Sequence, residues 1–142
     1  MKTIFVNESE QPRKWYIIDA AGKPLGRVAA KAAAILRGKD KVSFTPSQNM
    51  GDYLVIINAG KVAVSGNKTE DKMYYRHTGF VGGLKANNFA TLIERHPEDP
   101  VRLAVSGMLP HNRLGRALMG NCKIYAGSEH PHAAQNPQPM DV

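Results

Sequence analysis

The feature that most constrains the fold is a change of period early in the chain, from a strand pattern to a helix pattern. Residues 15–18 are a short apolar run of strand-forming side chains, and residues 20–24 read as a turn. Apolar residues then recur at helical spacing over 25–36, and Gly38 is a natural C-terminal stop. A nearly continuous apolar run at 53–57 is typical of a strand covered on both faces by helices. The sequence therefore predicts a layered α/β sheet.

The rest of the chain continues the alternation of strands and helices. The further elements are strands at 62–64, 73–75 and 123–126, a flexible glycine loop at 79–83, and helices that begin at Asn88, Asp99 and Leu114. The helix from Asp99 carries an apolar stripe of Val101, Ala104, Val105 and Met108. This alternation favours one α/β layer structure with some parallel pairing.

The length of 142 residues fits a single domain over 1–142. Residues 1–12 are expected to form an N-terminal extension, and residues 130–142 a proline-rich C-terminal tail that is mobile when free. No apolar stretch reaches the roughly 18 residues of a membrane span, and no signal or transit peptide is recognisable at the N-terminus. A protein of the cytoplasm, without a membrane partner, is the expectation.

The net charge of +7 indicates a polyanionic partner, and its distribution strengthens that interpretation. Residues 13–41 hold eight Lys and Arg against two Asp, and residues 101–128 hold four with no acid at all. The remainder of the chain is net acidic. Two basic blocks far apart in sequence predict a fold that brings both to one surface.

The strand, glycine loop and helix over 17–36 have the layout of a phosphate cradle. Gly22 and Gly26 lack the G-x-G-x-x-G spacing of a dinucleotide fold, and no Gly-Lys-Ser/Thr ending of a P-loop is present. We prefer an interpretation in which Lys23, Arg27 and Lys31 contact RNA phosphates. The alternatives are turn glycines beside a solvated basic helix face, or a small nucleotide-binding enzyme that uses this loop.

An aromatic and basic segment at 74–79 has the composition that stacks on unpaired bases and contacts phosphates in RNA. Successive side chains of a strand point to opposite faces, so at most one of Tyr74 and Tyr75 is expected to face RNA.

Catalytic and metal sites find little support in the sequence. Cys122, His130 and His132 could be zinc ligands in principle, but a buried cysteine and two exposed or RNA-facing histidines are preferred. No G-x-S-x-G elbow or recognisable carboxylate pair occurs. The expectation is a protein that is not an enzyme and has no cofactor.

A series of short motifs resembles the bacterial form of the L-thirteen family of large-subunit ribosomal proteins over nearly the whole chain. They are Trp15-Tyr16, Asp19-Ala20, Leu25-Gly26-Arg27, Gly51-Asp52-Tyr53, Gly66-Asn67-Lys68, Tyr75 with His77-Thr78-Gly79 and Gly82-Gly83, Ser106-Gly107-Met108-Leu109-Pro110, Leu114-Gly115-Arg116, and Tyr125-Ala126-Gly127 with His130, Ala133-Ala134-Gln135 and Pro137. The resemblance implies a three-layer α/β/α core around a four-stranded, mainly parallel sheet. It also implies direct binding to large-subunit ribosomal RNA, an early role in subunit assembly, and neighbouring large-subunit proteins as partners.

The charge blocks, the aromatic segment and the resemblance together predict a set of RNA-binding residues. The set is Lys23, Arg27, Lys31, Arg37, Lys39, Lys41, Lys68, Tyr75, Arg76, His77, Lys85, Arg113, Arg116 and His130. Where the family usually has basic residues, this chain has His111 and the segment 120–122, which lowers the charge of the second block. A regulatory protein that binds messenger RNA would use the same residues, so the sequence leaves that alternative open.

Overall fold

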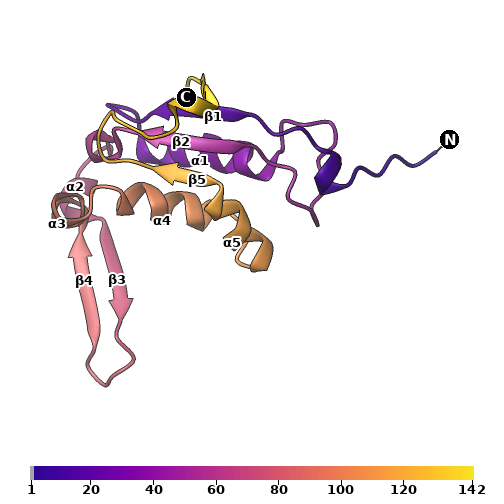
Figure 1. Cartoon of the computed structure of the whole chain (residues 1–142). Helices are drawn as coiled ribbons and strands as arrows, with labels where there is room; N and C mark the ends of the chain where they lie inside the picture. Colours follow the sequence, from indigo (N-terminus) through magenta and orange to yellow (C-terminus); the bar gives the residue numbers. More distant parts are fainter. Residues whose placement is uncertain (1) are drawn as a thin grey trace.

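A four-stranded sheet forms the centre of the molecule in a computed structural model that describes residues 2–142. Its strands are β1 (Trp15–Asp19), β2 (Tyr53–Ile57), β5 (Cys122–Ile124) and β6 (Gln138–Pro139), and every neighbouring pair is parallel. The order across the sheet is β5-β2-β1-β6, so β2 lies inside the sheet, as its apolar run predicts (Figure 1). The α/β class and the four-stranded parallel sheet are confirmed.

One face of this sheet packs against helices. The helix α1 (Leu25–Arg37) lies on β2, α4 (Asp99–Met108) packs against α1, and α5 (Arg113–Gly120) contacts β5. Fully buried residues from these elements meet in the core, among them Ile18, Val28, Leu36, Leu54, Ile56, Val101, Val105 and Leu118. Burial of such side chains stabilises a fold by about 1.5–3 kcal/mol each, before chain entropy is counted. The helical spacing over 25–36 is therefore the spacing of the core face of α1.

The other face of the sheet lies against the C-terminal segment. The rings of Trp15 and Tyr53 stack with their centroids 4.7 Å apart, and the ring of His132 stacks on Trp15 at 5.2 Å. From there the chain passes through a 3-10 turn, η3 (Ala133–Gln135), into β6, which pairs with β1. The segment 130–142, which the sequence predicts to be a tail, thus supplies the fourth strand of the sheet.

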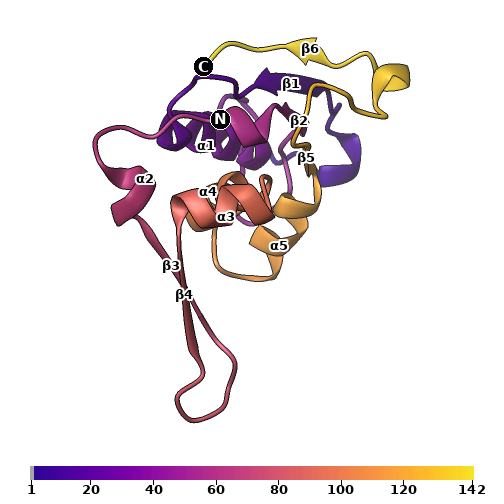
Figure 2. The same cartoon turned by 90° about the vertical axis from the view of Figure 1, so that its left-hand side faces the viewer.

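A two-stranded hairpin projects from this body, as Figures 1 and 2 show from two sides. Its strands are β3 (Met73–His77) and β4 (Leu84–Asn88), which pair antiparallel. Two short helices, α2 (Lys68–Asp71) and α3 (Phe89–Arg95), flank its base. The strand predicted at 73–75 is confirmed, whereas β4 is an element that the sequence does not indicate.

The starts of two helices follow the predicted signals, whereas one predicted strand and one predicted core position do not. The Asn88 side chain accepts the Thr91 N–H at 2.9 Å and caps α3, as predicted, and α4 begins at Asp99. The strand predicted at 62–64 is wrong, because α1 begins beside it and only a single bridge, Pro24 to Ala63, can form. The inward position of Met108 is also wrong, since the residue lies at the end of α4 and is 47% exposed.

Candidate nucleic-acid interface

The solvent face of α1 carries the first group of predicted RNA contacts. The pattern that buries Leu25, Val28 and Ala32 leaves Arg27 exposed and Lys31 half-buried on the opposite side of the helix. Among residues 2–142, neither of these two cations forms an ion pair. Like charges four residues apart weaken an isolated helix, so this face is electrostatically unsatisfied within the described chain.

The helix α5 presents the second group. The Asn112 side chain accepts the Gly115 N–H at 2.8 Å and fixes the start of the helix. A Cβ atom on Gly115 would overlap the carbonyl oxygen of Pro110, so only glycine permits this approach. Arg113 and Arg116 are exposed on the resulting helix and have no acidic partner in the described part of the chain.

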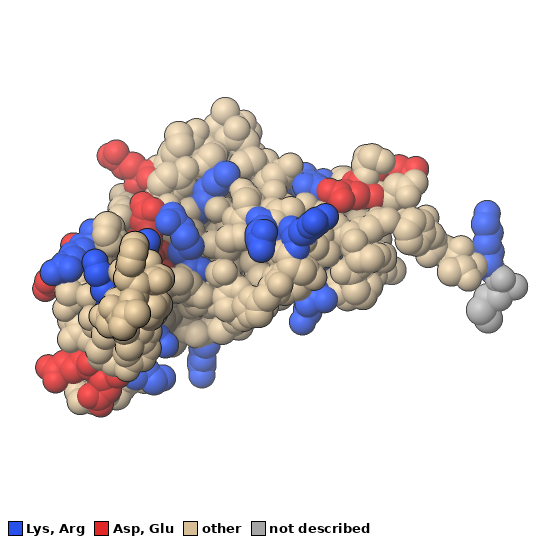
Figure 3. Space-filling view, turned by 90° about the horizontal axis from the view of Figure 1, so that it is seen from below, with Lys and Arg blue, Asp and Glu red and all other residues tan. Residues whose placement is uncertain are grey.

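The packing of the helices brings the two basic blocks near each other. Both α4 and α5 contact α1, so the helices that carry most of the two blocks are neighbours in the fold. On the face seen in Figure 3, several Lys and Arg side chains lie in the middle with no Asp or Glu among them, and toward its ends Lys and Arg lie together with Asp and Glu. Arg102 is the exception in the second block, because it pairs with Glu98 at 3.2 Å and Asp99 at 3.4 Å.

A shallow depression beside Arg116 adds further polar groups to this surface. It has a volume of about 380 Å³ and is bordered by Ser106, His111 and Asn112 as well as by the arginine. A hydroxyl, an imidazole and a guanidinium on one concave surface are groups that can donate hydrogen bonds to phosphate oxygens.

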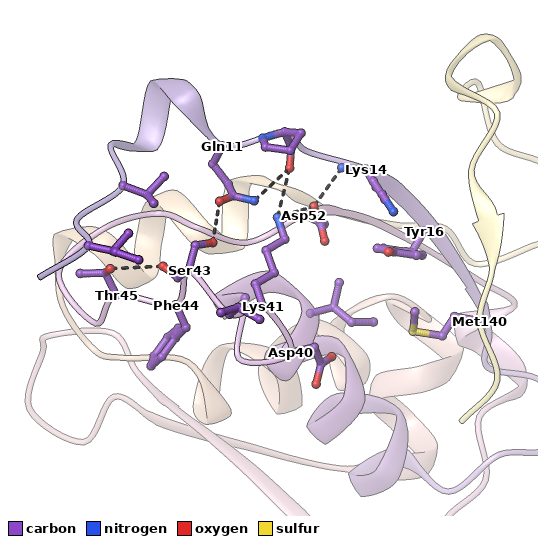
Figure 4. Close-up of a pocket in the computed structure, with 16 residues that line it drawn as sticks. Gln11, Lys14, Tyr16, Asp40, Lys41, Ser43, Phe44, Thr45, Asp52 and Met140 are labelled. Atoms are coloured by element: carbon purple, nitrogen blue, oxygen red, sulfur yellow. Dashed lines mark hydrogen bonds and ion pairs between the residues drawn. The ribbon is translucent and has the colours of Figure 1, made fainter. Parts of the chain in front are cut away.

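Lys41 lies differently from the other predicted contacts. Its ammonium group is 2.7 Å from a carboxylate oxygen of buried Asp52, and the lysine side chain is only 18% exposed. The same carboxylate oxygen accepts the Lys14 N–H at 2.9 Å, which joins the start of β1 to the loop before β2 (Figure 4). Lys41 therefore holds two parts of the fold together and is not available as a free phosphate contact.

A cavity between the N-terminal segment and the loop after α1 surrounds this ion pair. It has a volume of about 730 Å³ and is walled largely by apolar side chains such as Ile4, Ile35 and Phe44. Several of its polar groups are paired with one another, since the Ser43 hydroxyl also donates to Gln11 at 2.6 Å (Figure 4). A binding pocket for a small polar molecule needs polar groups that are free to converge on it, and these are engaged within the fold.

The loop before α1 is not a phosphate cradle. Its backbone N–H groups already donate within the fold: Gly22 to Lys61 at 2.9 Å, Lys23 to Ala20 at 3.1 Å and Leu25 to Ala63 at 2.9 Å. A nucleotide phosphate needs several unpaired amides at such a loop. The alternative of a nucleotide-binding enzyme thus loses the feature on which it depends.

The remaining predicted contacts are spread around this surface. Lys39 follows α1 and is exposed, and Lys68 begins α2 with its ammonium 3.5 Å from the Ser65 hydroxyl. The Lys23 ammonium is 3.9 Å from Asp141, and the Arg37 guanidinium lies 5.8 Å from the centre of the Phe44 ring. Of these, Lys39 is exposed and forms no side-chain hydrogen bond or ion pair with the described residues.

The C-terminal histidines and the cysteine belong to the packing of the sheet. Burial raises the pKa of the Cys122 thiol to about 12, so the thiolate needed for zinc binding or nucleophilic attack is strongly disfavoured. His132 is not the exposed side chain that the sequence suggests: it bonds the Tyr125 hydroxyl at 2.6 Å, and burial, followed by the nearby charges of His130 and Lys123, lowers its pKa. The His130 Nδ1 atom accepts the His132 N–H at 3.2 Å. Among residues 2–142 no group of three possible ligands is placed to hold a metal ion.

The hairpin carries the aromatic and basic segment away from the body. Tyr75 is 66% exposed, whereas Tyr74 is half-buried against the core, so Tyr75 is the more accessible of the two tyrosines. Arg76, His77 and Lys85 are exposed beside it. Phe80 and Val81, which are not among the predicted contacts, are exposed at the tip; an apolar pair between glycines is the sequence signal that indicates them.

The fold and its surface define a class: a basic α/β protein that presents clustered cations over helix faces and a projecting hairpin. None of its helices within residues 2–142 is long and apolar enough to cross a membrane. Comparison with known proteins then gives the family. The family model "Ribosomal protein L13" matches residues 13–131, and the chain belongs to this family.

Similar proteins cover the chain from end to end. A relative from Treponema denticola is 66% identical over 142 residues, with 100% of both chains covered, and one from Treponema pallidum (strain Nichols) is 62% identical with 99% of both covered. A third, from Symbiobacterium thermophilum, is 55% identical with 99% of both chains covered. Each is named "Large ribosomal subunit protein uL13". The family is one of structural proteins, so the chain is not an enzyme.

Proposed function

We propose that this protein is a constituent of the large subunit of the cytoplasmic ribosome, where it binds large-subunit ribosomal RNA and supports early subunit assembly. Neighbouring large-subunit proteins are its other partners. The observation that carries the RNA-binding part is the pair of adjacent helix faces, α1 and α5, whose cations have no acidic partners in the described chain.

The physical basis of this role is charge neutralisation by positioned groups. Lys and Arg release the counterions condensed on RNA, so affinity falls steeply with salt. Arg27, Arg113 and Arg116 can form bidentate contacts to phosphate, which fix register more firmly than the point charge of a lysine. Rigid helices hold these groups, so one RNA fold that matches their spacing is favoured over others.

The test is a pair of arginine substitutions measured by filter binding to large-subunit ribosomal RNA at fixed salt. Arg27→Ala with Arg116→Ala is expected to weaken binding about tenfold or more, because two phosphate contacts are lost. Arg102→Ala is the matched control, since that arginine is exposed on the neighbouring helix but paired with Glu98 and Asp99. Circular dichroism should show an unchanged fold in all variants, and equal affinities for the double variant and the native chain would refute the assignment.

Co-sedimentation separates the ribosomal role from that of a regulator of messenger RNA. The protein is expected in the large-subunit peak of a sucrose gradient, and it should persist there after a high-salt wash. Recovery only from the soluble fraction would contradict the ribosomal role, and nothing in the described residues favours messenger RNA over ribosomal RNA.

A further inference from the structure

The two faces of the hairpin differ sharply in chemistry. The register pairs Tyr75 with Ala86 and His77 with Leu84, so these four side chains share one face. Tyr75 and Leu84 are 66% and 60% exposed, and no part of the described chain covers them. One side of the hairpin is thus an aromatic and apolar surface in contact with water.

The opposite face of the hairpin is basic. Arg76 lies directly across from Lys85 in the ladder, and both side chains are exposed. Like charges directly opposite each other destabilise an antiparallel pair, and residues 72–88 contain no Asp or Glu to relieve the repulsion. Neither cation has an ion-pair partner in residues 2–142. This face is therefore complementary to an anion that the chain itself does not supply.

The tip of the hairpin is ordered by hydrogen bonds and ends in two apolar residues. The Thr78 N–H donates to Gly83 and the Gly83 N–H to Phe80, both at 3.0 Å, while the Gly79 N–H donates to the His77 ring at 3.0 Å. The turn needs positive φ at Gly79 and Gly82. Phe80 is 79% exposed and Val81 fully exposed, so a defined turn holds the pair outward.

Only the base of the hairpin is anchored to the body. The half-buried Tyr74 packs on the core, and β4 leads directly into α3, whose Phe89 and Leu92 are buried. The rest of the hairpin extends away from the body in both views (Figures 1 and 2). Its exposed apolar residues therefore do not contribute to the described core.

We infer that this hairpin inserts into ribosomal RNA, with Tyr75 and the Phe80–Val81 tip against unpaired bases and with Arg76 and Lys85 on flanking phosphates. Apolar wedges and aromatic rings are the groups that proteins place between or upon unstacked bases. A protein partner would suit the apolar face, but it would also need a concentrated acidic surface for the other face; RNA offers bases and phosphates together. The inference rests on the proposed function and names a second contact for it.

The first experiment compares four sets of substitutions in the full chain, with large-subunit ribosomal RNA as the probe and filter binding over a series of salt concentrations. Phe80→Ala with Val81→Ser is expected to lower affinity about tenfold with little change in salt dependence, because stacking is not a charge interaction. Arg76→Ala with Lys85→Ala is expected to reduce the slope of log affinity against log salt by about 1.4–1.8, since two phosphate contacts are removed.

The matched control is Phe5→Ala with Val42→Ser, which removes an exposed phenylalanine and an exposed valine outside the hairpin. Loss of binding in the tip variant and not in the control supports the inference. If the Arg27→Ala, Arg116→Ala variant loses affinity while both hairpin variants bind like the native chain, the hairpin assignment is overturned and the proposed function stands. If none of the variants loses affinity, both fail.

A second experiment identifies the molecule at the tip directly. A photoreactive benzoylphenylalanine replaces Phe80, and large subunits that contain the substituted protein are irradiated. A crosslink to ribosomal RNA is the expected result. A crosslink to another protein, or none while the protein is present in the subunit, would overturn the inference.

Discussion

The body and the hairpin use the same kinds of residue in opposite ways. In the body, Leu54 is buried in the core, Tyr16 packs against it, and the cations lie on the outer faces of helices. In the hairpin, Leu84, Tyr75 and Phe80 are exposed, and nothing in the described chain shields them. Apolar burial stabilises the body on its own, whereas the hairpin leaves unburied the same surface that a binding partner could cover. Buried apolar residues therefore identify the part of the chain that stabilises the fold, and exposed apolar residues identify the part that can contact a binding partner.

The largest expected difference is between two leucines. Leu54→Ala removes a fully buried side chain from β2 and should lower the free energy of unfolding by about 2–5 kcal/mol. Leu84→Ala, in the hairpin, should change it by less than about 0.5 kcal/mol, because that side chain is already largely in water. Urea denaturation followed by circular dichroism measures both, and similar losses in the two variants would contradict the comparison.

An intermediate difference is expected between two adjacent tyrosines. Tyr74→Ala deletes a half-buried ring that packs on the core and lies 5.5 Å from the Lys72 ammonium, so a loss of about 1–2 kcal/mol is expected. Tyr75→Ala should leave the free energy of unfolding within about 0.5 kcal/mol of the native value and weaken RNA binding instead. The two variants therefore show where, along β3, the anchored base of the hairpin ends and its exposed part begins. A larger loss in the free energy of unfolding for Tyr75→Ala than for Tyr74→Ala would contradict this assignment.

The smallest expected effect concerns pH and the sheet face covered by His132. Since burial lowers the pKa of His132 in the folded state, the unfolded chain binds a proton more readily. The free energy of unfolding that depends on neutral His132 is therefore fully present above about pH 6.5, the ordinary pKa of histidine. It is lost as the pH falls from there through the lower pKa of the folded state. The Asp19 carboxylate, whose pKa is lowered by hydrogen bonds from Ala21 and Asn58, acts only at more acid pH.

Unfolding measured at pH 7.5 and pH 5 should thus show a loss of stability in the native chain that is reduced in His132→Phe. The phenylalanine keeps a ring that can stack on Trp15 and removes the titrating group. An equal loss in the two proteins would exclude His132 as the source.

The sequence predicts those elements whose own residues carry a clear strand or helix pattern. It does not predict elements that depend on pairing with a distant strand. The order β1, α1, β2 follows from the hydrophobic pattern, which changes from strand spacing to helix spacing and back again. The strand β4 was missed because Lys85, Ala86, Asn87 and Asn88 are weak strand formers; their pairing depends on β3 beside them. The two residues of β6 are too few to show a pattern, and they become a strand only at the edge of β1.

In the candidate site, too, some residues could be placed from the sequence and others could not. Composition and spacing were enough to predict exposed cations on α1 and α5, because an amphipathic helix fixes which side faces water. They could not show that Lys41 pairs with Asp52, since that contact depends on how the loop between α1 and β2 folds back. The glycines around Phe80 indicate a turn, but only the structure shows that the turn is ordered and holds the ring outward.

The pairing of β1 with β6 has a consequence for how the molecule comes to exist. The first strand of the sheet in chain order is the neighbour of the last, with more than a hundred residues between them. Contacts between such distant segments slow folding, because a long loop must close before they form. Until residues 138–139 have been synthesised, one edge of β1 lacks its partner and can pair with any other exposed strand. A nascent or truncated chain that lacks β6 is therefore more prone to aggregation than the full chain, and pairing of β6 with β1 removes that exposed edge.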